Sequence, residues 1–144
     1  MTSDLDQSGL QLSVSSLMAR DPVTIQADSS LSQVAETLAD HDVSGMPVVD
    51  RGGALVGVVS QTDIVRLRAG SIPTSGWHGL LVRDVMTHPA ITVPASASLK
   101  EAAGLMTEHH VHRLVVVAEP ASIPIGVISE SDLIREVAAL SAED

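Results

Sequence analysis

The sequence predicts an α+β fold made of two copies of one unit, each with the element order β-α-β-β-α. Three observations support it: an internal repeat, an apolar content high enough for a folded core, and a periodicity that changes in the same order in each copy. The chain has 144 residues, of which 44% are hydrophobic. Such a composition is typical of a folded protein and argues against disorder.

The internal repeat is visible when the sequence is aligned with itself. The segment MARDPVTIQADSSL, which begins at Met18, aligns with MTHPAITVPASASL, which begins at Met86. After one inserted residue, Gly57 aligns with Gly126. A stretch rich in Gly, Ser and Pro separates the copies and is typical of a linker. The predicted organisation is a first domain at residues 12–69, a linker at 70–81 and a second domain at 82–140.

Each copy begins with a short extended segment that is followed by a helix. Residues 24–26 and 91–93 are rich in β-branched side chains and predict short strands. Apolar residues at helical spacing then predict helices that begin near Leu31 and Leu99.

Two strands and a closing helix complete each copy. The apolar runs are MPVVD and LVGVVS in the first copy, and RLVVVA and IGVIS in the second. Because these runs are continuously apolar, they predict strands covered on both faces. The closing helices are expected at 62–69 and 131–140.

Composition excludes several classes of protein. The chain has 8 basic and 18 acidic residues, a formal net charge of −10, and no Cys. Nucleic-acid binding draws on basic surface, so no nucleic-acid partner is expected. No apolar run approaches the length of a membrane helix and the N-terminal residues do not resemble a signal peptide, so we expect a cytoplasmic protein without membrane contact.

The junction between the last strand and the closing helix carries Ser and, three residues later, Asp. These pairs are Ser60 with Asp63, and Ser129 with Asp132. One interpretation is a capping box and nothing more. The other adds a ligand, because a helix N-terminus attracts anions and a carboxylate there can accept both hydroxyls of a ribose.

A second distinctive string, VHRLVVV, places two polar residues at the entry to an apolar strand. His112 and Arg113 begin this strand, where burial of an unpaired charge is costly. Arg113 is either paired with a nearby Asp or is part of a phosphate clamp, in which Arg forks onto phosphate oxygens and His donates a hydrogen bond.

These strings resemble those of a pair of CBS domains (a Bateman module), named for cystathionine β-synthase. The resemblance rests on VSSLMARDPVTI with VRDVMTHPAITV, on GMPVVD, and on GVVSQTD with GVISESD, and it covers about residues 12–140. It implies two repeats packed as a pseudo-two-fold pair. It also implies that the cleft between them binds an adenosine compound such as AMP, ADP, ATP or S-adenosylmethionine.

The resemblance also implies roles for individual residues. Asp63 and Asp132 match the Asp that holds the ribose diol, and Ser60 and Ser129 match a Ser near phosphate. The string with His112 and Arg113 resembles the phosphate-contacting segment of the γ subunit of AMP-activated protein kinase, whereas its first-repeat counterparts, Ser44 and Gly45, carry no charge. We expect Asp63 and Arg113 to share one site across the pseudo-two-fold axis.

The adenine base is expected to meet the first strand of each copy and apolar residues at the start of the second. The resemblance implies that the backbone at Thr24 and Thr92 reads the adenine edge, although Thr is also common in any short strand. For Met46 taken alone, the sequence favours a role as core filler. The remaining expected ligand-binding residues, the walls around the base and their neighbour, are Val43, Met46, Pro47, Val111 and Leu114.

Enzyme and metal chemistry have little support in the sequence. His109, His110 and His112 lack the spacing of helical zinc motifs, so they are expected to mark a helix end and a strand entry. We therefore expect a protein that is not an enzyme and requires no cofactor.

The function predicted is a regulatory module that binds an adenine nucleotide (AMP, ADP or ATP) and signals to an unidentified effector protein. The alternatives are a ligand-free structural or dimerisation module, or binding of S-adenosylmethionine or a metal. The closing helices carry apolar residues around more than one stripe, for example Leu133, Ile134 and Val137, which predicts a homodimer through these helices.

Overall fold

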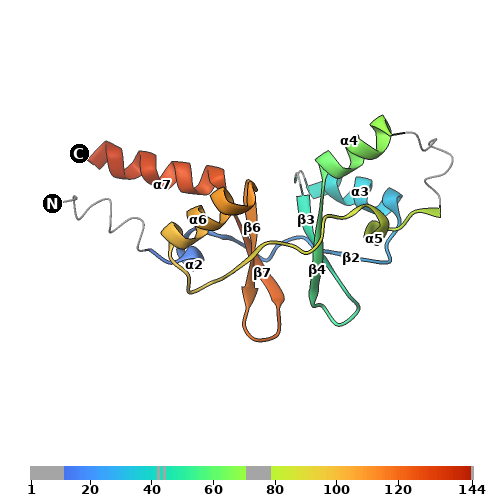
Figure 1. Cartoon of the computed structure of the whole chain (residues 1–144), viewed down its shortest axis with the longest axis horizontal. Helices are drawn as coiled ribbons and strands as arrows, with labels where there is room; N and C mark the ends of the chain where they lie inside the picture. Colours follow the sequence, from blue (N-terminus) through green and yellow to red (C-terminus); the bar gives the residue numbers. More distant parts are fainter. Residues whose placement is uncertain (1–11, 42, 44, 71–78, 144) are drawn as a thin grey trace. The chain divides into compact units, whose positions relative to one another are not determined.

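The computed structural model describes residues 12–41, 43, 45–70 and 79–143 (Figure 1). The chain forms two compact units. The first-repeat unit is Pro22–Ala90, and the second-repeat unit combines the described residues up to Asp21 with those from Ile91 onward. Each unit is described by itself.

The first-repeat unit contains a three-stranded sheet in the order β2-β3-β4. β2 is parallel to β3, and β3 is antiparallel to β4, with Gly45 opposite Ser60. The elements of this unit are β2 (Ile25–Gln26), α3 (Leu31–His41), β3 (Gly45–Val49), β4 (Leu55–Ser60), α4 (Gln61–Ala69) and α5 (Val82–Val85).

The second-repeat unit contains a four-stranded sheet in the order β1-β7-β6-β5. β5 is parallel to β6, and β6 is antiparallel to β7, with Arg113 opposite Ser129. The elements of this unit are α2 (Val14–Leu17), β1 (Ala19–Arg20), β5 (Thr92–Pro94), α6 (Leu99–His109), β6 (Arg113–Ala118), β7 (Ile123–Ser129) and α7 (Glu130–Glu143).

The predicted α+β class and the order of elements in each copy are confirmed. The bounds of β4 and β6 match the predicted runs, and α3 and α6 begin at the predicted Leu31 and Leu99, whereas both closing helices begin one residue earlier than predicted. Three short elements, α2, α5 and β1, were not predicted. Two or four residues are too few to show a periodicity, and β1 forms because it pairs with β7.

The segment that precedes each repeat packs on the sheet of the other repeat. Val14 and Met18 lie in the core of the second-repeat unit, whereas Val82 lies in the core of the first-repeat unit with Met86 packed against it. The compact units therefore do not coincide with the sequence repeats. The domain bounds of 12–69 and 82–140 follow the repeats and stay a prediction.

A glycine in each unit permits this packing. A Cβ added to Gly126 would lie 2.6 Å from Met18 Sδ and 2.9 Å from the carbonyl oxygen of Ala19. A Cβ added to Gly57 would lie 2.7 Å from Met86 Sδ and would also meet a backbone carbonyl oxygen. The strand and the crossing segment approach so closely that there is no room for a side chain at either position.

The central strands are buried along their length. In β6, the four consecutive residues from Leu114 to Val117 are all buried. In β3, the four from Met46 to Val49 are buried as well. The prediction of strands covered on both faces is confirmed for β3 and β6. It is wrong for β4 and β7, along which buried and partly buried residues alternate.

Candidate functional site

The start of α4 is a capping box in the first-repeat unit. Ser60 is the N-cap, and its Oγ accepts a hydrogen bond from Asp63 N at 3.4 Å. Asp63 Oδ2 accepts in return from Ser60 N at 2.8 Å. The other carboxylate oxygen, Oδ1, accepts from Thr87 Oγ1 at 3.2 Å. The predicted capping box is present for this pair, and both oxygens of the carboxylate are held in place.

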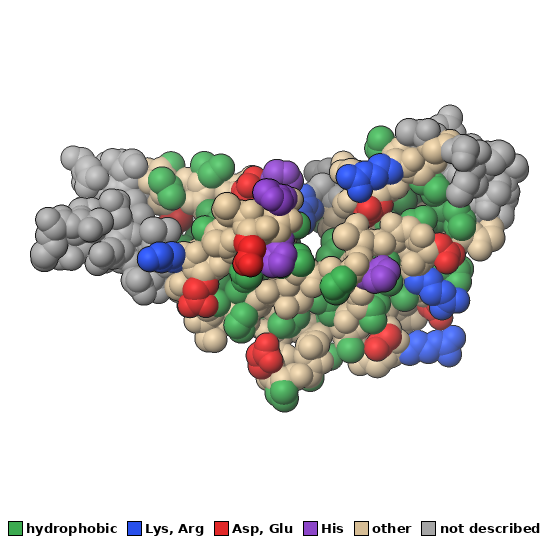
Figure 2. Space-filling view, viewed as in Figure 1, with side chains coloured by type: hydrophobic (Ala, Val, Ile, Leu, Met, Phe, Trp, Pro, Cys, Tyr) green, Lys and Arg blue, Asp and Glu red, His purple; other side chains and the backbone are tan. Residues whose placement is uncertain are grey.

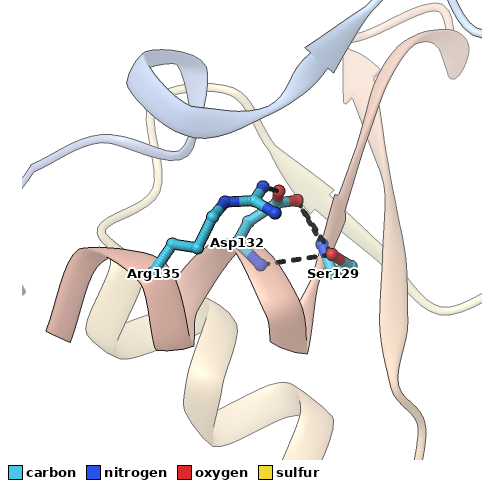
Figure 3. Close-up of polar contacts among 3 residues, drawn as sticks. All are labelled: Ser129, Asp132 and Arg135. Atoms are coloured by element: carbon cyan, nitrogen blue, oxygen red, sulfur yellow. Dashed lines mark hydrogen bonds and ion pairs between the residues drawn. The ribbon is translucent and has the colours of Figure 1, made fainter. Parts of the chain in front are cut away.

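The start of α7 repeats this arrangement in the second-repeat unit. Ser129 N donates to Asp132 Oδ2 at 2.8 Å, and Asp132 N donates to Ser129 Oγ at 3.3 Å. The remaining oxygen, Asp132 Oδ1, is paired with Arg135, one turn further along the helix (Figure 3).

The two carboxylates differ in what holds their second oxygen. In the repeat alignment, Thr87 corresponds to Ala19, which has no hydroxyl group to offer Asp132. Arg135 supplies the partner instead, with a side chain that is 73% exposed. An exposed ion pair contributes little to stability, so a ligand hydroxyl can replace Arg135 at small cost. The Asp132 carboxylate itself is only 14% exposed and stays oriented by its cap.

His112 and Arg113 lie beside the start of α7. The strand register places Arg113 opposite Ser129, and Glu130 N donates to His112 O at 2.8 Å. The imidazole Nδ1 of His112 is 2.9 Å from Glu130 Oε2. The structure therefore brings four predicted residues of the second repeat, His112, Arg113, Ser129 and Asp132, to the same end of the β6–β7 pair.

Arg113 does not have the acidic partner that the simpler interpretation required. It is partly buried, and none of the acidic residues described forms an ion pair with it. Its counterpart in the first-repeat unit is Gly45, opposite Ser60. A guanidinium group is thus placed at one helix start and absent from the equivalent position of the other.

The residues predicted to surround the base lie in or against the two cores. Met46, Pro47 and Leu114 are fully buried, so the core-filler interpretation of Met46 is confirmed. Val43 and Val111 are partly buried and pack against the cores.

The structure describes Thr24 and Thr92 but not Ser44. Thr24 precedes β2, Thr92 lies in β5, and both are exposed. Ser44 lies outside the described residues. Recognition of the adenine edge by the backbone at Thr24 and Thr92, and ligand binding by Ser44, stay predictions.

Three residues that contact these helix starts were not predicted from the sequence: Thr87, Glu130 and Arg135. Thr87 and Glu130 act across 24 and 18 residues of sequence, so their contacts depend on strand pairing. Arg135 carries a local signal, because a cation three residues after an Asp on a helix is positioned to pair with it.

His109 and His110 mark the boundary between α6 and the strand that follows it, as predicted. α6 ends at His109, and His110 follows it in a left-handed conformation with φ 54°. Figure 2 shows histidine and acidic side chains gathered near the end of α6 and the start of α7. In the described ranges no three His, Asp or Glu side chains are grouped to hold a metal ion. Nor is any helix within those ranges long and apolar enough to span a membrane.

The family model for the CBS domain matches the chain twice, at residues 14–70 and 82–139. The chain therefore belongs to the CBS domain family, and it contains a CBS pair, which is a regulatory type of module.

Solved structures agree with this assignment. The structure of CBSX2 in complex with AMP is 30% identical, has a TM-score of 0.75, and the match covers 92% of this chain and 98% of that one. The CBS domain of a membrane protein from Sphaerobacter thermophilus is 26% identical with a TM-score of 0.79, covering 92% and 91% of the two chains.

The curated relatives include both short and long proteins. Hypoxic response protein 1 of Mycobacterium tuberculosis (strain ATCC 25618 / H37Rv) is 31% identical over 110 residues, which are 75% of this chain and 73% of that protein. Homoserine O-acetyltransferase of Methanocorpusculum labreanum is 32% identical over 88% of this chain but only 24% of the enzyme. Inosine-5'-monophosphate dehydrogenase of Korarchaeum cryptofilum is 31% identical over 82% of this chain and 23% of the enzyme. The chain thus spans about a quarter of these two enzymes.

Proposed function

We propose that this CBS pair binds an adenine nucleotide, AMP, ADP or ATP, in a cleft between its repeats and transmits that binding to a separate effector protein in the cytoplasm. The observation that carries the proposal is the group at the start of α7. There a capped carboxylate, Asp132, lies on the helix that begins beside His112 and Arg113.

The chemistry of this group matches the parts of a nucleotide. The second oxygen of Asp132 is held only by the exposed Arg135, and once that ion pair opens the carboxylate can accept from the hydroxyls of a ribose. A guanidinium group suits phosphate oxygens because it can donate two parallel hydrogen bonds. The dipole of α7 adds positive potential at the same place, because the helix begins there. CBSX2, the solved relative that is 30% identical, was determined in complex with AMP, which supports the same class of ligand here.

The contacts favour Asp132 as the ribose acceptor of the site that contains Arg113. Both residues lie in the second-repeat unit, where the register joins Arg113 to Ser129, the cap partner of Asp132. Asp63, expected from the sequence to share a site with Arg113, belongs to the capping box at the start of α4, where the equivalent strand position is Gly45. In the proposal, Thr24, Thr92, Val43 and Val111 face the adenine base.

The guanidinium group of Arg113 argues against S-adenosylmethionine as the ligand. S-adenosylmethionine carries a positively charged sulfonium, which a site with a guanidinium group disfavours, whereas phosphate is attracted to it. A scaffold without a ligand has no need of a partly buried Arg113 that lacks an acidic partner among the residues described.

The exposed apolar faces of α4 and α7 support a homodimer as the assembled form. Val65 is 64% exposed on α4 and Ile134 is 66% exposed on α7, and these positions are equivalent in the two repeats. Val137 is 53% exposed, also on α7, along which Figure 2 shows apolar side chains at the surface. A second copy related by a two-fold axis offers an identical pair of apolar faces, so we propose that it is the partner.

Thermal unfolding with a panel of ligands tests the proposal. The panel contains adenosine, AMP, ADP, ATP and S-adenosylmethionine, with GMP as the control for base recognition. A ligand at a hundred times its Kd should stabilise the fold by about 2.7 kcal/mol, because it binds only the folded state. Unchanged melting with every adenosine compound at millimolar concentration would contradict the proposal and favour the scaffold alternative.

A further inference from the structure

We propose that Glu130 makes this site select ligands with few phosphate charges, so that AMP binds more tightly than ATP. The inference rests on the proposed function, in which phosphate lies near His112 and Arg113. It adds a specificity-determining residue that neither the repeat pattern nor the comparisons identify.

Two contacts hold Glu130 against the end of β6. Its backbone N–H donates to His112 O at 2.8 Å, and its Oε2 is 2.9 Å from His112 Nδ1. Because Arg113 follows His112 directly, the Glu130 carboxylate is held at the same strand end as the guanidinium group.

The negative charge of Glu130 opposes an anion at this helix start. The first turn of α7 carries two carboxylates, Glu130 and Asp132, whereas that of α4 carries only Asp63. The residue equivalent to Glu130 in the first repeat is Gln61, which is neutral. A carboxylate in the first turn offsets the positive end of the helix. Its repulsion of a ligand grows with each phosphate charge, since the Coulomb energy is proportional to the product of the charges.

Glu130 also competes for the hydrogen bond of His112. With its proton on Nδ1, the ring donates to Glu130 Oε2 and does not offer that hydrogen to a phosphate oxygen. A phosphate that takes the Nδ1 hydrogen of His112 must first displace the carboxylate. A single phosphate held by Arg113 can avoid this exchange, whereas a chain of three phosphates carries more charge past the same carboxylate.

The variant Glu130→Gln tests the inference because it keeps the size of the side chain and copies the residue of the first repeat. Dissociation constants for adenosine, AMP and ATP are measured by calorimetry at fixed ionic strength, with EDTA present so that ATP keeps its full charge. The wild-type protein should bind AMP more tightly than ATP. In the variant, adenosine affinity should stay within about twofold, AMP affinity should rise about threefold and ATP affinity about tenfold, as expected for one charge acting at short range through partly solvated surroundings.

The matched control is Glu119→Gln, which makes the same change of charge in the same unit. Glu119 is exposed and follows β6 at the end opposite His112. It should leave the ratio of AMP to ATP affinity unchanged. The melting temperature of unliganded Glu130→Gln should stay close to that of wild type, because both members of the His112–Glu130 pair are exposed.

The outcomes separate the inference from the proposed function. If no adenosine compound binds the wild-type protein, the proposed function fails. If nucleotides bind but wild type prefers ATP, or if Glu130→Gln leaves the ratio of affinities unchanged, only the inference is overturned. An equal change in Glu119→Gln overturns it as well, because the effect would then come from net charge alone.

Discussion

Asp63 and Asp132 each combine two roles that a mutation would remove together. Each carboxylate caps its helix through Oδ2, and each has a second oxygen whose partner comes from outside the cap. An alanine variant of either Asp loses the N3 half of its capping box, which destabilises the helix start, so weaker ligand binding is ambiguous when measured alone. The two effects can be separated because the capping box of one repeat serves as the stability control for that of the other.

The first prediction concerns the ribose and phosphate contacts. Arg113→Ala should weaken AMP binding about 10-fold to 100-fold and leave adenosine unchanged, because it removes a charge-assisted contact of about 1.5–3 kcal/mol. Asp132→Ala should weaken AMP and adenosine equally, because both contain the ribose. Calorimetric titration of each variant with both ligands measures these effects.

Asp63→Ala is the matched control for Asp132→Ala, since it loses the same kind of cap in the other repeat. It should leave the site that contains Arg113 intact. If Asp63→Ala weakens AMP and Asp132→Ala does not, then the pairing of Asp63 with Arg113 expected from the sequence is correct.

The second prediction compares two glycines that have no room for a side chain, Gly57 and Gly126, with one that faces open space, Gly104. Gly126→Ala and Gly57→Ala should each destabilise the fold by about 1–3 kcal/mol, because the new methyl group would overlap a methionine sulfur and a backbone carbonyl. Gly104→Ala should stabilise α6 by up to about 1 kcal/mol, since no atom lies within 4 Å of the added Cβ. Urea denaturation measures all three, and equal effects would contradict the close approach at Gly57 and Gly126.

Among the elements, α4 and α7 differ from an ordinary surface helix. Each ends its repeat and packs against its own unit, yet each also exposes large apolar side chains, Val65 on α4 and Ile134 on α7. Single exposed apolar residues are common, but the same position is apolar and exposed on the closing helix of each repeat, which favours contact with a second copy.

The third prediction is that the apolar faces of α4 and α7 join two copies of the chain. Light scattering across a tenfold dilution series should give a mass near twice 15.0 kDa at the higher concentrations. The double variant Val65→Glu with Ile134→Glu should be monomeric with an unchanged circular dichroism spectrum, because charge on an apolar interface opposes association. Ser32→Glu, at an exposed position of α3, is the control and should remain dimeric. A wild-type mass of 15.0 kDa at every concentration would assign these faces to a different chain.

At the scale of the whole molecule, the chain exchanges short segments between its repeats. α2 and β1 belong to the second-repeat unit, although the sequence places them before the first repeat. α5 belongs in the same way to the first-repeat unit, where Val82 is fully buried. Neither repeat as read from the sequence therefore contains its complete core.

The fourth prediction follows from this exchange. A fragment of residues 22–90 should fold and melt cooperatively, because it keeps Val82 and Met86 against the core of its unit. A fragment of residues 12–70 lacks both and should melt at a much lower temperature or not fold. Burial of these two side chains contributes about 3–6 kcal/mol, which is comparable to the total stability of a small domain. Thermal melting by circular dichroism compares the two, and equal melting would show that the sequence repeats are the folding units.

The sequence by itself determined what depends on neighbouring residues. The order of elements follows from local periodicity, and the capping boxes of Ser60 with Asp63 and Ser129 with Asp132 follow from a spacing of three residues, which a single helical turn brings together. The short strand β1 and the short helices α2 and α5 escaped prediction because packing, and not periodicity, makes them form.

Only the tertiary structure decided which residues meet across the chain. Met18 packs on Gly126 because β1 joins the sheet of the other repeat, and no local pattern encodes that pairing. His112 meets Glu130 because an antiparallel register places the start of β6 beside the end of β7. A shift of one residue in that register would turn the side chains of β6 to the opposite face and separate Arg113 from the helix start. The candidate residues were therefore readable in the sequence, but their partners were not, because a partner is chosen by strand pairing between distant segments.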